Sequence, residues 1–190
     1  MGKVVVTEFV SLDGVMEDPG GAEEYEHGGW TFKFDRGDEG NKFKLDEVLA
    51  ADAQLLGRRT YEGFAKAWPS IKDEAGFADK MNSMPKFVVS KTLRTAEWNN
   101  STVLDGDLAE EVGKLKEQFS GDILVAGSAQ LVQGLLRNDL VDELHLMIFP
   151  VALGTGKRLF EDGADLRTFD LVETAQMGAV AVLVLRRAAG

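Results

Sequence analysis

The residues best suited to chemistry in this sequence lie where a mostly apolar run meets a helical pattern. Gly57 ends the run at 53–56, and Arg58, Arg59 and Thr60 then open the helical pattern. Free N–H groups and the helix dipole make such an N-terminus favourable for anions. Because two guanidinium groups stand there in a chain of net charge −11, the segment predicts a site for a phosphate-bearing ligand.

Two further segments place small, hydroxylated or basic residues after a predicted strand. They are Ser90, Lys91 and Thr92, and Gly127, Ser128, Ala129 and Gln130. In an α/β sheet, ligands bind outside the carboxyl ends of the strands, so neighbouring strands would join the three segments into one wall. A tight turn explains any one glycine equally well, and neither the G-x-G-x-x-G nor the P-loop pattern occurs. The three segments together favour a nucleotide site.

Composition restricts the class of protein. The 190 residues are 44% hydrophobic and 28% charged, which suits one globular domain over residues 1–190. The 32 acidic against 21 basic residues argue against nucleic-acid binding. No apolar run approaches the roughly 20 residues of a membrane span, and the early acid Glu8 leads us to expect no signal peptide in the first residues. With no cysteine and two histidines, we expect a cytoplasmic protein without a metal centre.

The order of elements predicts the fold. Strands are expected at 3–10, 53–56, 86–90, 102–104, 122–127, 142–150 and 179–186, and helices at 44–52, from 60, at 107–118 and at 128–137. This alternation predicts a three-layer α/β fold with a mostly parallel central sheet and helices on both faces. The last two strands lack a helical pattern between them, so we expect an antiparallel C-terminal strand pair.

Four segments carry a resemblance to a known family. They are Ser11-Leu12-Asp13-Gly14, Gly57-Arg58-Arg59-Thr60-Tyr61, Leu124-Val125-Ala126-Gly127-Ser128, and Leu140-Val141-Asp142-Glu143-Leu144 continuing to 149–154. In this order the chain resembles the dihydrofolate-reductase-like family, in the branch of the riboflavin-biosynthesis reductase, the RibD C-terminal domain. The resemblance implies NADPH as hydride donor, a homodimer, and a small heteroaromatic or carbonyl substrate, pterin-like or 5-amino-6-ribosylaminouracil phosphate-like.

The resemblance also assigns the three segments. Gly57 to Thr60 match the part that holds the cofactor phosphates, Ser90 to Thr92 the part near the adenosine 2′-phosphate, and Gly127 to Gln130 the turn under the pyrophosphate. Two positions depart from the family. The acid of folate reductases corresponds to Asn41, and the substrate-contacting acid of riboflavin reductases corresponds to Val125. A non-catalytic NADPH-binding or sensing module of the same fold is therefore the alternative, and another phosphorylated ligand is a third possibility.

Candidates for the substrate side are fewer. Asp13 follows the first strand and is either a catalytic group that relays a proton or a turn residue that caps local N–H groups. Trp30 and Phe32 either stack on a flat substrate ring or, together with Phe34, form a short strand with one apolar face. Val125 would line the same region, and His145 is expected to be an ordinary sheet-face residue.

Overall fold

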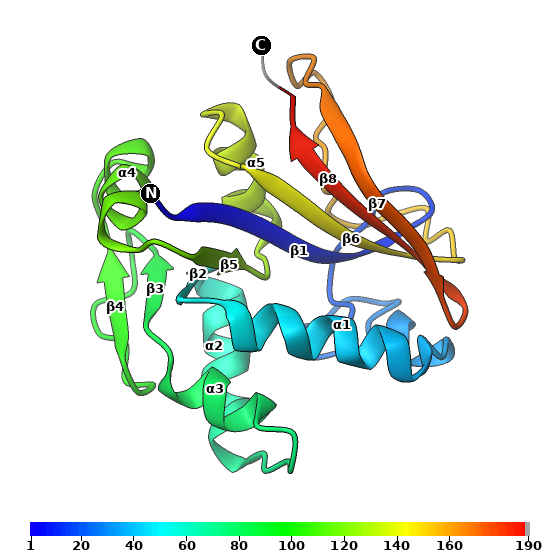
Figure 1. Ribbon diagram of the computed structural model, residues 1–190, viewed down its shortest axis with the longest axis horizontal. Helices are drawn as coiled ribbons and strands as arrows, with labels where there is room; N and C mark the ends of the chain where they lie inside the picture. The colour runs from blue at the N-terminus through cyan, green and yellow to red at the C-terminus, as the bar shows by residue number, and fades with distance from the viewer. Residues whose placement is uncertain (189–190) are drawn as a thin grey trace.

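Residues 1–188, which the computed structural model describes, are organised around one eight-stranded sheet (Figure 1). The strands are β1 (Lys3–Ser11), β2 (Ala53–Gly57), β3 (Lys86–Val89), β4 (Ser101–Leu104), β5 (Asp122–Val125), β6 (Glu143–Phe149), β7 (Phe169–Met177) and β8 (Val180–Arg187). The helices are α1 (Gly37–Ala50), α2 (Arg58–Ala67), α3 (Phe77–Ser83), α4 (Leu108–Gln118) and α5 (Ala129–Arg137), with 3-10 helices η1 (Trp30–Lys33) and η2 (Trp68–Ser70).

The strand order is β4-β3-β2-β5-β1-β6-β8-β7. Pairing is parallel from β4 to β6 and antiparallel from β6 to β7. The expected antiparallel partners, β6 and β8, are confirmed, with Leu146 opposite Leu183. The strand β7 was not expected; it forms the edge of the sheet and pairs only with β8 among the described strands. Most of its residues are exposed, so it carries no buried apolar pattern that would identify it.

Helices cover both faces of the sheet, as predicted. Successive residues of β1 point to opposite faces. Val4 and Val6 pack with residues of α4 and α5, such as Val112 and Leu135. Val5 packs instead in a second cluster, which takes residues from α1, α2 and α3. Because both faces are buried, the parallel strands read as continuous apolar runs rather than alternating ones.

A third core cluster fixes the long segment between β1 and α1. Trp30 is fully buried, and its ring meets Phe149 of β6 edge-on at 5.4 Å. The indole N–H donates to the carbonyl of Glu17 at 2.9 Å, which satisfies its one polar group. The short strand considered for 30–34 is wrong, because residues 30–33 form η1. The helix expected from 44 begins at Gly37, and α3 was not expected.

Lys86 is a buried cation that ties β3 to its surroundings. The residue has no exposed surface, and its ammonium group donates to the carbonyls of Asn82, Met84 and Asn99 at 3.2, 2.8 and 2.9 Å. The same group lies 4.2 Å from the centre of the Trp98 ring. One side chain therefore satisfies carbonyls from the end of α3, the approach to β3 and the approach to β4.

We predict that Lys86→Met lowers the free energy of unfolding by about 3 kcal/mol, because three carbonyls lose a bond from the ammonium group, one of them fully buried. Urea denaturation of both proteins measures the difference. Lys72→Met, at an exposed position, is the control and should change stability by no more than about 0.5 kcal/mol. Equal midpoints for the Lys86 variant and the unaltered protein would contradict the assigned role.

Candidate functional site

The three predicted phosphate segments lie on three adjacent strands. β2 pairs with β3 on one side and with β5 on the other, all in parallel. Their carboxyl ends therefore meet at the same edge of the sheet. The N–H of Gly57 donates to the carbonyl of Gly127 at 3.2 Å, which joins two of the segments directly. The continuous wall expected from the sequence is present in the fold.

The ends of β2 and β5 approach each other too closely for side chains. A Cβ built on Gly57 would lie 2.1 Å from Ser128 Oγ, and one on Gly127 would lie 2.7 Å from Thr60 Oγ1. Gly127 also has a φ of 81°, which favours glycine. These two glycines allow α2 and α5 to begin side by side.

Both of these helices begin without a side-chain cap. Gly57, the N-cap of α2, has no side chain, and the hydroxyl of Ser128, the N-cap of α5, accepts no hydrogen bond from its helix. By contrast, Asp107 caps α4 by accepting from the N–H groups of Ala109 and Glu110. The first N–H groups of α2 and α5 thus remain available to an anion, and the helix dipoles favour one.

Arg58 connects the start of α2 to the segment after β3. Its guanidinium donates to Thr92 Oγ1 at 2.6 Å and pairs with Glu62 at 2.8 Å. Arg59 lies 3.7 Å from Glu23, an acid of the segment that precedes α1. The two arginine side chains remain 46% and 66% exposed, so both can still reach an anion in solvent.

The segment after β3 is a tight turn with a basic tip. Ser90 is buried, and its hydroxyl accepts from the N–H groups of Thr92 and Leu93 at 3.2 and 2.9 Å. Ser90 therefore shapes the turn, while Lys91 and Thr92 are exposed. The ammonium group of Lys91 donates to the carbonyls of Asp105 and Gly106, just beyond β4.

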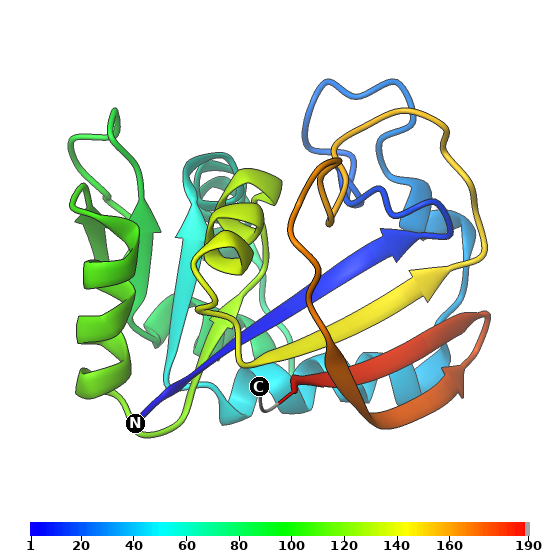
Figure 2. The same cartoon turned by 90° about the horizontal axis from the view of Figure 1, so that it is seen from above.

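Asp13 is a structural acceptor that joins two connecting segments. Its carboxylate accepts from the hydroxyl of Ser11 at 2.6 Å and from the N–H groups of Leu153 and Gly154 at 3.0 and 2.7 Å. Figure 2 shows the segments after β1 and β6 side by side, and Asp13 links them. These donors, the Ser11 hydroxyl first, hold the pKa of Asp13 well below its usual range. It stays ionised at neutral pH, so this geometry favours the turn interpretation over proton relay.

Two of the three substrate candidates are inaccessible. Val125 and Trp30 have no exposed surface, and each packs in a core cluster. Phe32 is 79% exposed and is the member of the three that can meet a ligand. Contact of Trp30 or Val125 with a substrate is therefore not supported by this structure.

The structure adds an acid that the sequence analysis did not consider. Glu8 lies in β1, and its carboxyl oxygen accepts from the N–H of Gly127 at 2.5 Å. Burial raises the pKa of Glu8 to about 8, although the bond from Gly127 and the charge of Lys44 oppose that change. A visible signal existed, because Glu8 interrupts a run of apolar and β-branched residues.

On the opposite face, polar groups of α1, β1 and β6 form a closed cluster. Glu47 accepts from the Thr7 hydroxyl at 2.9 Å, lies 2.7 Å from the Lys44 ammonium group, and lies 2.6 Å from His145 Nδ1. Burial alone would lower the pKa of His145, but its bonds and charge interactions with Glu47 and Glu143 raise it. Since these partners satisfy it, His145 fits the expected sheet-face role.

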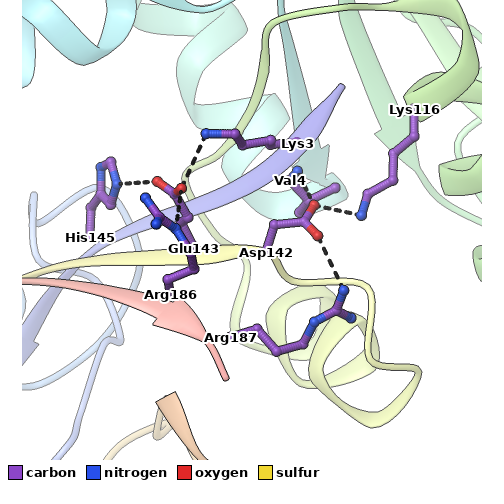
Figure 3. A network of polar contacts seen from close by, with 8 residues as sticks. All are labelled: Lys3, Val4, Lys116, Asp142, Glu143, His145, Arg186 and Arg187. Atoms are coloured by element: carbon purple, nitrogen blue, oxygen red, sulfur yellow. Dashed lines mark hydrogen bonds and ion pairs between the residues drawn. The ribbon is translucent and has the colours of Figure 1, made fainter. Parts of the chain in front are cut away.

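This cluster continues into an ion-pair network at the amino end of β6 (Figure 3). Glu143 contacts Lys3, Arg186 and His145 Nε2 at 3.2, 3.2 and 3.4 Å. Its neighbour Asp142 accepts from the N–H of Val4 at 2.8 Å. The network joins β1, β6 and β8 and lies at the other end of the strands from the candidate site.

Two cavities lie away from the candidate site. Their volumes are about 430 and 350 Å³, and both are lined by Leu136, Leu166, Arg167 and Phe169. Leu136 is near the C-terminus of α5, whereas the candidate site uses its N-terminus. Within residues 1–188 no helix is long and apolar enough to cross a membrane, and no three His, Asp or Glu side chains are placed to hold a metal ion.

Comparison with known proteins identifies the family. The RibD C-terminal domain matches residues 2–183, so the chain belongs to this family of reductase-type domains. Two curated proteins of Bacillus subtilis (strain 168) are similar, and both are named as uncharacterized. YyaP is 28% identical, covering 96% of this chain and 93% of its own, and YwjB is 27% identical, covering 98% of each.

Solved structures share the dihydrofolate-reductase-like fold. A protein of Shewanella sp. PV-4, provisionally named a riboflavin biosynthesis protein, aligns with a TM-score of 0.78 at 20% identity, over 98% of this chain and 99% of that one. RibD of Acinetobacter baumannii, in its form 1, aligns with a TM-score of 0.64 at 15% identity. That alignment covers all of this chain but 59% of the RibD chain, so this chain corresponds to part of RibD.

We predict that Asp13→Asn lowers Tm by about 3 °C at pH 7, because the amide cannot accept all three hydrogen bonds. The folded-state pKa is depressed, so the carboxylate contributes stability above the ordinary aspartate pKa and loses it as pH falls. The Tm difference should therefore shrink on acidification from pH 5 towards pH 3. Thermal melts of this variant and of Asp162→Asn, at an exposed position, make the comparison, and a pH-independent difference would contradict it.

Proposed function

We propose that this member of the RibD C-terminal domain family is an NADPH-dependent reductase. It would transfer hydride to a small heteroaromatic or carbonyl substrate. The observation that carries the proposal is the pair of uncapped helix N-termini at adjacent strand ends, next to two exposed arginines. Together they offer backbone donors and positive charge to a chain of phosphates.

The hydrogen-bond donors and positive charges of these segments are of the kinds that the phosphates of NADPH require. The start of α2, with Arg58 and Arg59, would hold cofactor phosphates, and the turn at 127–130 would hold the pyrophosphate. Lys91 and Thr92 would bind the adenosine 2′-phosphate, because both are exposed at the tip of the neighbouring turn. When bound, NADPH supplies the hydride, and the protein binds and orients the reactants and excludes water.

The substrate is proposed from the family. A pterin-like or 5-amino-6-ribosylaminouracil phosphate-like compound suits a family whose solved members carry riboflavin-biosynthesis names. Phe32 offers an exposed ring for stacking on a flat heterocycle. We further propose a cytoplasmic homodimer with small-molecule ligands and without nucleic-acid or membrane partners. The net charge of −11 supports the exclusion of nucleic acid.

A non-catalytic NADPH-binding or sensing module is the second candidate. It is favoured by the structural use of Asp13 and by the complete burial of Val125 at the position of the substrate-contacting acid. The test is NADPH oxidation in the presence of dihydrofolate, the pyrimidine precursor of riboflavin and a panel of small carbonyl compounds. Turnover with any of them supports the reductase, whereas tight binding without turnover supports the module.

We predict that Arg58→Ala/Arg59→Ala weakens NADPH binding about 100-fold, the effect of losing two charge-assisted contacts in a partly exposed site. Fluorescence titration with NADPH measures the dissociation constant. Arg186→Ala/Arg187→Ala removes a matched arginine pair from β8 and should leave the affinity unchanged. Undiminished affinity in the Arg58/Arg59 variant would remove the basis for this site.

We predict that Lys91→Ala reduces the preference for NADPH over NADH about tenfold, because one cation near the 2′-phosphate is lost. Titration with both nucleotides measures the ratio. NADH affinity should stay the same, and Lys114→Ala on α4 is the control for a change in overall charge. An equal loss of affinity for NADPH and NADH would show that Lys91 does not contact the 2′-phosphate.

A further inference from the structure

Glu8 is a buried acid that none of the proposed phosphate contacts uses. The residue is 7% exposed and lies on β1, the strand between β5 and β6. One carboxyl oxygen, Oε1, accepts from the N–H of Gly127 at 2.5 Å. Within residues 1–188, the other carboxyl oxygen, Oε2, has no hydrogen-bond partner, and the remaining exposure of the residue leaves a little of it open.

The register of the sheet places this carboxyl at the candidate site. Val6 of β1 lies opposite Val125 of β5, so Glu8 lies two residues further along, level with Gly127. Gly127 in turn packs against Thr60 at the start of α2 and precedes the start of α5. The acid thus stands where β1 meets the two uncapped helix N-termini.

The surroundings favour the protonated form of this acid. On its own face of the sheet, β1 presents Val6 and Val10, and the facing residue of β6 is Leu146. The strand β5 ends there at Val125, and the first turn of α5 has no acidic or basic residue. Lys44 of α1 is the charged group that acts on Glu8. Burial outweighs it and raises the pKa of Glu8 to about 8, so the group carries a proton at neutral pH.

We propose that Glu8 is the proton donor of the reductase reaction and faces the reacting end of the bound cofactor. This inference rests on the proposed function. When bound, NADPH supplies a hydride, two electrons with one hydrogen nucleus, to the carbon of a C=N or C=O bond. The Glu8 O–H bond breaks as a bond from that proton to the substrate nitrogen or oxygen forms. Glu8 is left as a carboxylate and regains its proton from water.

The oxidised cofactor offers a test that needs no substrate. The nicotinamide ring of NADP⁺ is positively charged, whereas that of NADPH is neutral. A positive charge beside Glu8 favours its carboxylate and expels the proton. NADP⁺ binding should therefore release about half a proton or more at pH 7.5, and NADPH binding should release almost none. If Glu8 only supported the Gly127 turn, NADP⁺ and NADPH would release the same number of protons on binding.

Calorimetric titration in two buffers of different ionisation enthalpy measures the proton release. Glu8→Gln keeps an acceptor for the Gly127 N–H but has no acidic proton, so we expect it to abolish the release and to change NADPH affinity less than about threefold. Glu143→Gln, which alters an acid at the far end of β6, is the matched control and should retain the release. Once a hydride-accepting substrate is found, the rate at which the unaltered protein reduces it should fall above pH 8. The Glu8→Gln variant should reduce it slowly at every pH and show no such fall.

The outcomes separate the two proposals. If neither nucleotide binds, the proposed function fails. If both bind but NADP⁺ releases no proton, or Glu8→Gln releases as much, the role of Glu8 is overturned and the cofactor site stands. Should Glu8→Gln fold poorly, ¹³C NMR of the unaltered protein labelled at glutamate carboxyls decides. One carboxyl should titrate near pH 8 and shift to lower pH with NADP⁺, and the absence of that shift overturns the proposal.

Discussion

The close approach of β2 and β5 at Gly57 and Gly127 is the constraint on which the rest of the candidate site depends. The two backbones are joined by a hydrogen bond, and a methyl group at either position would overlap a hydroxyl of the facing segment. The approach sets the starts of α2 and α5 next to each other. Neither helix then receives a side-chain cap, and their first N–H groups stay available. The proposed site for anions thus depends on packing at two small residues rather than on a binding motif.

Successive side chains of the central strand β1 point to opposite faces of the sheet, and the acids on the two faces have different surroundings. Glu8 points to the face covered by α5, where its neighbours are apolar, and burial favours its neutral form. Thr7, one residue earlier, points to the other face and donates to Glu47. There a cation and an imidazole surround the carboxylate, and they outweigh burial and lower the pKa of Glu47. Burial therefore favours the neutral form of Glu8 on one face of the sheet, whereas charged partners favour the ionised form of Glu47 on the other.

The chain belongs to the RibD C-terminal domain family over residues 2–183, and two sets of contacts hold the loops next to the candidate site. Asp13 ties together the segments that follow β1 and β6, and Trp30 anchors the segment that precedes α1. These contacts fix loops around the strand ends. Beside them, β1 contributes the buried acid Glu8, while the end of β5 carries the buried Val125.

The sequence by itself determined the alternation of strands and helices, the antiparallel pairing of the strands at 142–150 and 179–186, and the three segments at the strand ends. These features depend on local patterns, such as apolar runs ended by glycine, and a few neighbouring residues are enough to specify each pattern. Only the tertiary structure decided which side chains face solvent. Trp30 and Val125 are buried, Phe32 is exposed, and Glu8 meets Gly127 across 119 residues of sequence. Burial and proton affinity arise from packing between segments that are distant in sequence, and the residues of one strand do not specify which elements will pack against it.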